Sequence, residues 1–215
     1  MRPDLRAELL RRAERDQEAR SNGARVGWQA VSAIDAENLA WLAGVVADVG
    51  WPGKSMVGDD GAHAAWLLAQ HADGDPAFQR VCLDLLAAAT VRGDAAPREL
   101  AYLTDRVLLA EGQPQLYGTQ CIGRDGQWVP RRLRDPGTVD DRRAAMSLPP
   151  LADYTGRLGE AYGPPAPATV PCGQCGSGVE FWPPEDGTAY PITCRECGWT
   201  TTVAMDTPRD RGTGR

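Results

Sequence analysis

Residues 62–89 read AHAAWLLAQHADGDPAFQRVCLDLLAAA, and this stretch indicates two helices joined by a short turn. Gly74 ends the first helix. Pro76 suits the first turn of the second, where its missing N–H is not needed. The second helix has an apolar stripe at the three- and four-residue spacing of an amphipathic helix, formed by Phe78, Val81, Cys82, Leu85, Leu86 and Ala89. The stretch therefore predicts α-helices, and the pattern continues on both sides of it.

Helical periodicity covers the chain from about residue 4 to residue 112. Gly50 and Pro52 terminate the apolar helix before the quoted stretch, and Asp59 or Asp60 is placed to cap the helix that opens it. Helices are expected over 4–20, 34–49, 62–73, 76–89 and 97–110.

Strand-like runs appear after residue 112. Residues 115–123 and 127–133 flank Arg124-Asp125-Gly126, a turn sequence typical of a β-hairpin. Two more short helices are expected over 139–148 and 151–163.

The stretch GPPAPATVP, residues 163–171, is rich in proline and predicts a linker between two domains. We expect a mainly α fold: a helical domain with a small β-hairpin over residues 1–162, and then a small β zinc-ribbon module over 172–205. The tail over 206–215 is expected to be flexible.

Composition narrows the class of protein. The chain has 215 residues, and its hydrophobic share of 42% suffices for a packed core. A net charge of -6 disfavours a protein built around nucleic-acid backbones. No apolar run approaches the roughly 20 residues of a membrane helix, and no secretory signal opens the chain. We expect a cytoplasmic protein, and the arginine-rich, lysine-poor composition suggests a bacterial source.

Gly53-Lys54-Ser55 matches the end of a phosphate-binding P-loop. The first glycine of that motif would stand at position 48, which is Asp48. Pro52 has no N–H for a phosphate, and the preceding element is helical where the motif needs a strand. We therefore expect a helix-terminating turn here and no nucleotide site.

Four cysteines near the end of the chain form the most specific motif. Cys172 and Cys175, followed by Cys194 and Cys197, give two C-x2-C knuckles separated by eighteen residues. This spacing predicts one Zn²⁺ ion held by four thiolates, and disulfides are disfavoured in a cytoplasmic chain. Four thiolates close the coordination shell, so we expect the zinc to be structural.

The ribbon carries mostly acidic charge, which disfavours nucleic acid as its partner. Its acidic residues Glu180, Glu185, Asp186 and Glu196 face only one basic residue, Arg195. Its aromatic residues are Phe181, Trp182, Tyr190 and Trp199. They suit either a contact surface for a protein partner or packing within the chain, and packing is the simpler interpretation for so small a module.

Several polar residues of the helical part are candidates for a site. His71 falls on the apolar face of its helix, where it is either a core residue satisfied by a hydrogen bond or a general base or ligand in a pocket. His63 is eight residues away on the same helix, too far for both to hold one metal. Asp105-Arg106 suits an ordinary ion pair or a pocket, and Tyr117-Gly118-Thr119-Gln120 suits a structural network or a ligand site.

The ordered series DAENLAWLAGVVADVGWPGKSMVG, AWLLAQHADGD, TDRVLLAEGQPQLYGTQ and VDDRRAAMSLPPL resembles a bacterial family of unknown function, domain-of-unknown-function family 6624. The resemblance covers about residues 5–155, and the ribbon lies outside it. It implies that Gln70-His71, Asp105-Arg106 and Tyr117–Gln120 are family motifs. It supplies no activity.

Two functions from different classes follow. In the first, the helical domain carries a pocket for a small molecule or peptide and acts as a hydrolase, a modifying enzyme or a binding module. His71 would then be the acid/base, Asp105 its orienting partner and Arg106 an anion clamp, while Tyr117 and Gln120 would donate hydrogen bonds to the substrate. In the second, the protein is a non-enzymatic adaptor whose ribbon recognises a protein, and the polar motifs form a closed internal network.

Overall fold

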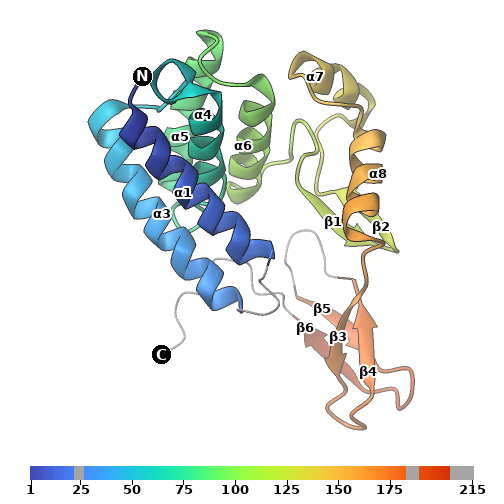
Figure 1. The fold of residues 1–215 in the computed structure, drawn as a ribbon. Helices are drawn as coiled ribbons and strands as arrows, with labels where there is room; N and C mark the ends of the chain where they lie inside the picture. Colours follow the sequence, from blue (N-terminus) through green and yellow to red (C-terminus); the bar gives the residue numbers. More distant parts are fainter. Residues whose placement is uncertain (22–26, 183–188, 204–215) are drawn as a thin grey trace.

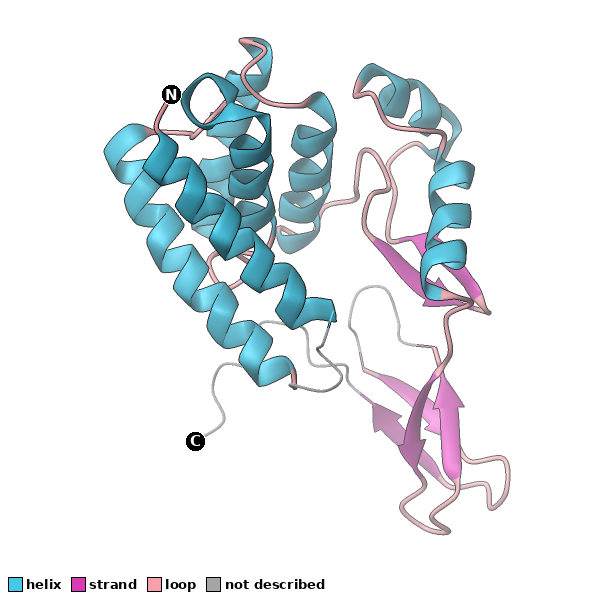
Figure 2. Ribbon diagram, in the orientation of Figure 1, coloured by secondary structure: helices cyan, strands magenta, loops and turns pink. Residues whose placement is uncertain are grey.

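The computed structural model describes residues 1–21, 27–182 and 189–203. The predicted fold class is confirmed: the described chain is mainly helical, with small two-stranded sheets (Figures 1 and 2). The helices are α1 (Pro3–Ser21), α3 (Trp28–Val49), α4 (Lys54–Gln70), α5 (Pro76–Val91), α6 (Pro97–Ala110), α7 (Val139–Ala145) and α8 (Leu151–Tyr162). The strands are β1 (Cys121–Arg124), β2 (Gln127–Pro130), β3 (Ala168–Pro171), β4 (Gly178–Phe181), β5 (Tyr190–Thr193) and β6 (Thr200–Val203). The predicted tail, residues 206–215, lies outside the described residues.

Helices α1 and α3–α6 pack together around one apolar core (Figure 1). Each of these five helices contributes fully buried side chains to this core, for example Leu9, Leu42, Leu68, Leu86 and Leu103. Asp75 caps α5 through a hydrogen bond from the Phe78 N–H at 2.9 Å, with Pro76 in the first turn as expected.

Helix α4 begins earlier than the sequence suggested. We expected Asp59 or Asp60 to cap it, but the helix starts at Lys54 and continues through a kink at Gly58, whose φ of 78° breaks the helical path. The carboxylate that holds its start is Asp94, which accepts a hydrogen bond from the Ser55 N–H at 2.6 Å. The cap comes from a distant loop, so local spacing did not indicate it.

The predicted hairpin is present as β1 and β2, joined at Asp125 and Gly126 in left-handed conformations. Helix α8 packs beside it (Figure 1). Two hydrogen bonds fix this arrangement: the Trp128 indole donates to the Gly163 carbonyl at 2.9 Å, and the Tyr154 hydroxyl donates to the Thr119 carbonyl at 2.9 Å.

The C-terminal module consists of two antiparallel hairpins, β3–β4 and β5–β6. Strand β3 is formed by Ala168–Pro171, so the last four residues of the predicted linker belong to the first strand of the module. The module has its own small apolar cluster, formed by Val179, Phe181 and Ile192 together with Cys172 and Cys194.

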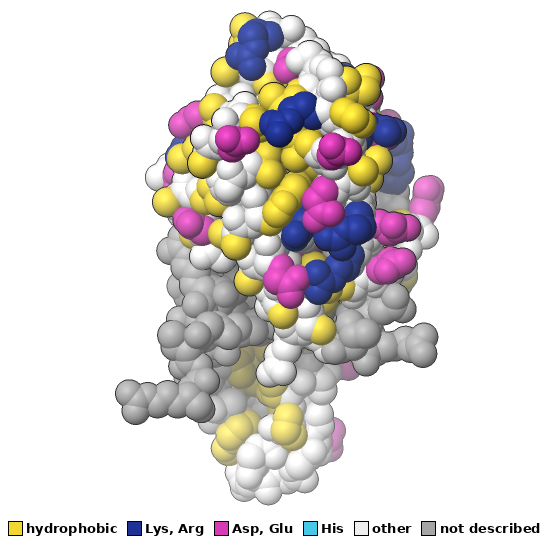
Figure 3. All heavy atoms as spheres, turned by 60° about the vertical axis from the view of Figure 1, so that its left-hand side comes forward, with side chains coloured by type: hydrophobic (Ala, Val, Ile, Leu, Met, Phe, Trp, Pro, Cys, Tyr) yellow, Lys and Arg dark blue, Asp and Glu magenta, His cyan; other side chains and the backbone are white. Residues whose placement is uncertain are grey.

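Helix α3 differs from the expectation that no apolar run approaches the length of a membrane helix. Over Gln29–Val49 it is, within the described part of the chain, the one helix long and apolar enough to cross a membrane, and 17% of that apolar window is buried. Here α3 packs against α1 and α4. The face of the molecule in Figure 3 mixes hydrophobic side chains with acidic and basic ones and shows no extensive patch of a single charge.

Candidate functional site

The four predicted ligand cysteines lie together at the tips of the two hairpins. All their sulfur atoms lie within 4.8 Å of one another. Cys172 and Cys197 are 3.6 Å apart, and Cys175 and Cys194 are 3.7 Å apart. Tetrahedral Zn²⁺ with Zn–S bonds of about 2.3 Å requires sulfurs about 3.8 Å apart, so the spacing fits zinc and is far too long for disulfides.

The two knuckles repeat the same backbone structure. The Gly176 N–H donates to the Cys172 carbonyl at 2.9 Å, and the Gly198 N–H donates to the Cys194 carbonyl at 3.0 Å. Both glycines have left-handed φ values, 77° and 74°, which other residues adopt with strain. The sequence thus folds locally so that each pair of thiols faces the other pair, and the four sulfur atoms are placed to hold one metal ion.

The other two cysteines lie apart from this cluster. Burial raises the pKa of the Cys82 thiol to about 12 and that of the Cys121 thiol to about 11. Both thiols are therefore protonated at neutral pH.

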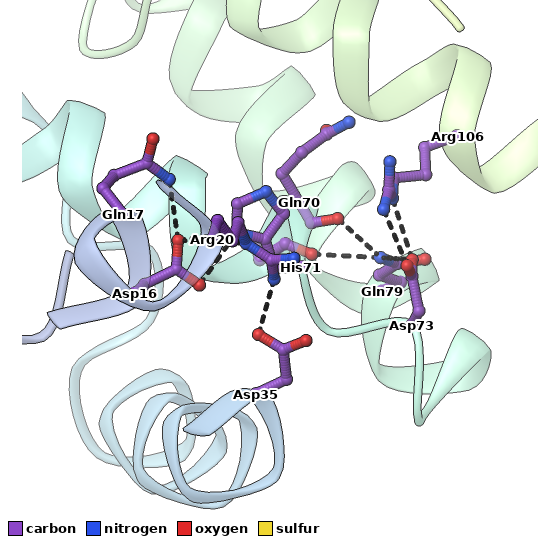
Figure 4. A network of polar contacts seen from close by, with 10 residues as sticks. Asp16, Gln17, Arg20, Asp35, Gln70, His71, Asp73, Gln79 and Arg106 are labelled. Atoms are coloured by element: carbon purple, nitrogen blue, oxygen red, sulfur yellow. Dashed lines mark hydrogen bonds and ion pairs between the residues drawn. The ribbon is translucent and has the colours of Figure 1, made fainter. Parts of the chain in front are cut away.

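His71 lies at the end of α4 in a cluster of charged residues from three helices (Figure 4). Its Nδ1 atom is 3.0 and 2.9 Å from the two carboxylate oxygens of Asp16 in α1. Arg20, one turn further along α1, places Nε 3.1 Å from the same Nδ1 and binds Asp35 of α3 through Nη2 at 2.6 Å. We call Asp16, Arg20, Asp35 and His71 the His71 cluster.

Burial shapes the charges of the His71 cluster. The Asp16 side chain is 1% exposed, against 25% for Asp35. Burial opposes ionisation of Asp16, but its hydrogen bond to His71 and the nearby charges lower its pKa. Burial raises the pKa of Asp35, and the neighbouring Asp16 adds to this effect. The cluster therefore holds two acids that repel each other, with Arg20 between them.

Arg106 lies on α6 and lines a groove of about 1000 Å³. Its guanidinium is held by Asp73 at 2.8 and 2.6 Å and by the Gln120 side-chain oxygen at 3.0 Å. Burial opposes ionisation of Asp73, yet the hydrogen bonds and charge of Arg106 keep its pKa below the usual value. We call this groove, whose charged lining residues are Asp73, Arg80, Arg106, Glu111, Arg131 and Arg132, the Arg106 groove.

Gln79 forms part of the groove wall. Its side-chain nitrogen donates to Asp73 at 3.0 Å and contacts two carbonyls of the α4 end, while its buried Oε1 has no hydrogen-bond partner within the described residues. A buried acceptor without a donor costs free energy unless a ligand or water supplies one.

Asp105 lies in a different environment from the one expected. It is fully buried and does not contact His71; its oxygens accept hydrogen bonds from the N–H groups of Leu116, Tyr117 and Thr119 and from the Thr119 hydroxyl, at 2.8–3.0 Å. Burial raises the pKa of Asp105 despite these donors. The carboxylate that contacts His71 is Asp16 of α1, a residue that no sequence pattern singled out.

The segment around Tyr117 is held from its other side by Arg143. This arginine is completely buried and donates to the carbonyls of Tyr117 and Pro149, each at 2.6 Å, while its guanidinium lies over the Tyr154 ring. Asp105 thus binds N–H groups of the segment, and Arg143 binds a carbonyl. In this structure the motif forms a buried polar network in which the Tyr117 backbone takes part, and the Nη2 atom of Arg143 has no hydrogen-bond partner among the described residues.

The predicted site residues are therefore divided among three places. Arg106 and Gln120 meet in the Arg106 groove, Asp105 and Tyr117 meet in the network beside it, and His71 lies in its own cluster. Asp73 connects the Arg106 groove with the His71 cluster, because its side chain contacts Arg106 and it follows His71 by two residues in the chain (Figure 4). Asp16, Arg20 and Asp35 were missed because they lie in other helices, 15 to 55 residues from their partners.

In the Gly53-Lys54-Ser55 segment, the backbone N–H groups that a P-loop would offer to a phosphate bind another residue of the protein. The Lys54 N–H donates to the Asp94 carbonyl at 2.9 Å, and the Ser55 N–H donates to its carboxylate. Asp94 thus sits where a P-loop would hold a phosphate, and a helix precedes the segment.

Comparison with curated proteins and comparison with solved structures gave no match. Comparison with protein-family models gave one match over residues 3–165, which include every helix of the described residues and the β1–β2 hairpin. The ribbon cysteines follow the matched region. Since the match spans most of the chain, the protein belongs to the family of unknown function DUF6624, and a four-cysteine cluster with the geometry of a metal site follows the family domain.

Proposed function

We propose that the helical domain binds an anionic small molecule, or an acidic group of a peptide, in the Arg106 groove. The observation that supports it most directly is the convergence of Arg106 and Gln120 in a groove lined by three further arginines but only two carboxylates. This charge balance attracts an anion, and arginine binds carboxylates and phosphates through paired N–H groups. The volume of about 1000 Å³ lies at the upper end of the range for small-molecule sites.

The binding groups are held in place before a ligand arrives. Asp73 and Gln120 fix the Arg106 guanidinium, and Glu111 binds Arg80 through both carboxylate oxygens at 2.7 Å. A preorganised site loses less side-chain entropy on binding.

The proposal concerns binding, because His71 does not line the groove. Hydrolysis or group modification stays a prediction from the sequence. In the same proposal the ribbon holds one structural Zn²⁺ ion, which stabilises a module too small to fold on apolar burial alone.

The adaptor hypothesis also stays a prediction. The aromatic residues that suggested it are used within the chain where their side chains are described. Phe181 is 8% exposed, Trp199 packs against the ribbon cluster, and an added Cβ at Gly123 of the hairpin would lie 3.2 Å from Trp182.

The test is a thermal shift assay on the full chain with inorganic phosphate, pyrophosphate, citrate and a short acidic peptide. We expect at least one anion to raise the melting temperature of the wild type, and Arg106→Gln to abolish the shift. Arg98→Gln is the matched control, because Arg98 is an exposed arginine of α6 that does not line the groove. Shifts of equal size in both variants would contradict the proposal.

A further inference from the structure

We propose that the His71 cluster is a binding site for one divalent transition-metal ion, held by Asp16, Asp35 and His71. The ligand atoms of these three residues lie within 4.8 Å of one another and come from three helices, α1, α3 and α4. This site is separate from the four-cysteine site, and the inference does not depend on the Arg106 groove.

The geometry at Nδ1 of His71 points to a cation. Both Asp16 oxygens lie 3.0 and 2.9 Å from Nδ1, while the Arg20 Nε lies 3.1 Å from Nδ1 and 3.3 Å from Asp16 Oδ2. The imidazole nitrogen and the Asp16 carboxylate thus converge on one positively charged group, the Arg20 guanidinium. A metal ion in that position would face the Nδ1 lone pair and the carboxylate oxygens together.

The charges lead to the same conclusion. Asp16 and Asp35 place carboxylate oxygens within 4.8 Å of each other, and Asp16 is almost entirely buried. Arg20 alone supplies a permanent positive charge among the four residues. Its side chain is 26% exposed and lies in the last turn of α1, so it has a way into solvent when an ion enters. We infer that Arg20 occupies the cation position when no ion is bound.

The donor set indicates the class of ion. One imidazole nitrogen and two carboxylates suit Mn²⁺, Fe²⁺ or Zn²⁺, whereas Mg²⁺ and Ca²⁺ prefer oxygen ligands alone. Gln17 donates to Asp16 Oδ2 at 2.8 Å and orients that carboxylate, as outer partners of metal ligands do (Figure 4). Three protein ligands leave coordination positions open for water or a small ligand.

The experiment titrates Mn²⁺ alone into the full, zinc-containing chain and follows free Mn²⁺ by electron paramagnetic resonance. Mn²⁺ is a suitable probe because it prefers carboxylate and water oxygens to thiolates, so the cysteine site does not compete. We expect one bound Mn²⁺ per chain. His71→Gln and Asp35→Asn should each weaken binding by more than the roughly 10–100-fold cost of losing an outer partner.

Two further variants separate a metal site from an ordinary ion-pair network. Arg20→Ala removes the competing cation and should tighten Mn²⁺ binding about tenfold or more, since a unit charge at this distance acts strongly. His63→Gln is the matched control: His63 contacts the Glu99 carboxylate at 2.8 Å and belongs to no cluster of three possible metal ligands among the described residues, so the variant should bind like the wild type.

The result that overturns the proposal is a wild-type chain that binds no Mn²⁺ at millimolar concentration. Binding that survives unchanged in both Asp35→Asn and His71→Gln would place the ion elsewhere and overturn it equally. Arg20→Ala without tighter binding would show that the guanidinium does not share the ion's position, and would also count against it. Circular dichroism of each variant checks that the helices are intact.

Discussion

At the scale of single residues, the polar motifs of the helical domain have two different kinds of surroundings. Asp105 and Arg143 are buried and bind backbone groups of one segment, so they stabilise its conformation. Asp73 and Arg106 are partly exposed and pair at the edge of a groove. Replacing Asp105 or Arg143 is therefore expected to lower the stability of the protein, whereas replacing Asp73 or Arg106 is expected to weaken ligand binding.

Replacing Asp105 by alanine should lower the free energy of unfolding by about 3 kcal/mol, because several buried donors lose their acceptor at once. Urea unfolding followed by circular dichroism at 222 nm measures the change. Asp84→Ala, at an exposed position of α5, is the control and should not destabilise the protein. A loss below about 1 kcal/mol for Asp105→Ala would mean that the network is less important than its geometry indicates.

Asp73 should make stability depend on pH. Its pKa is lowered in the folded state, so its pairing with Arg106 stabilises the protein above the unfolded pKa of about 3.9, and this contribution is lost as the pH falls through the folded value. The side chain is 43% exposed, so we expect about 1 kcal/mol or less. Urea unfolding of the wild type and Asp73→Asn should show a difference that is constant from pH 7 to about pH 5 and shrinks below about pH 4. A difference independent of pH would show that the ion pair does not stabilise the fold.

At the scale of elements, helix ends depend on distant loops. The start of α4 approaches Asp94 so closely that a Cβ on Gly53 would lie 2.1 Å from its Oδ2 and 2.5 Å from its Cγ. This close approach explains why glycine stands before Lys54 and Ser55 without any phosphate to bind.

The variant Gly53→Ala should therefore destabilise the protein by about 1–3 kcal/mol, because the loop must shift and the hydrogen bonds to Asp94 break. The matched variant is Gly44→Ala in the exposed interior of α3, where an added Cβ meets nothing within 4 Å. It should stabilise the protein by up to about 1 kcal/mol, since alanine is the better helix former. Thermal unfolding of the two variants should give shifts of opposite sign; shifts of the same sign would contradict the packing at Asp94.

At the scale of the whole molecule, the helical core and the ribbon cluster share no buried residue among the residues described. Two of the five buried ribbon residues are cysteines of the metal site. The ribbon should therefore depend on its metal, while the helical domain should not.

Removing zinc with a strong chelator should expose the amides of β3–β6 to hydrogen exchange and leave the helical circular dichroism nearly unchanged. Cys175→Ser should lower the zinc content measured by mass spectrometry, whereas Cys121→Ser should retain it, because Cys121 lies outside the cluster. Ribbon amides that stay protected without zinc would show that apolar packing alone holds the module.

The sequence by itself determined the helices and the metal-binding cysteines. Both follow from the local spacing of residues: apolar periodicity makes a helical face, and C-x2-C followed by glycine folds into a knuckle independently of its position in the chain. Only the tertiary structure decided the partners of the polar residues. Asp16 reaches His71, and Asp94 reaches Ser55, because helix packing brings together segments 55 and 39 residues apart. A carboxylate pairs with the hydrogen-bond donor that helix packing brings beside it. The local sequence around either residue carries no signal for such a long-range contact.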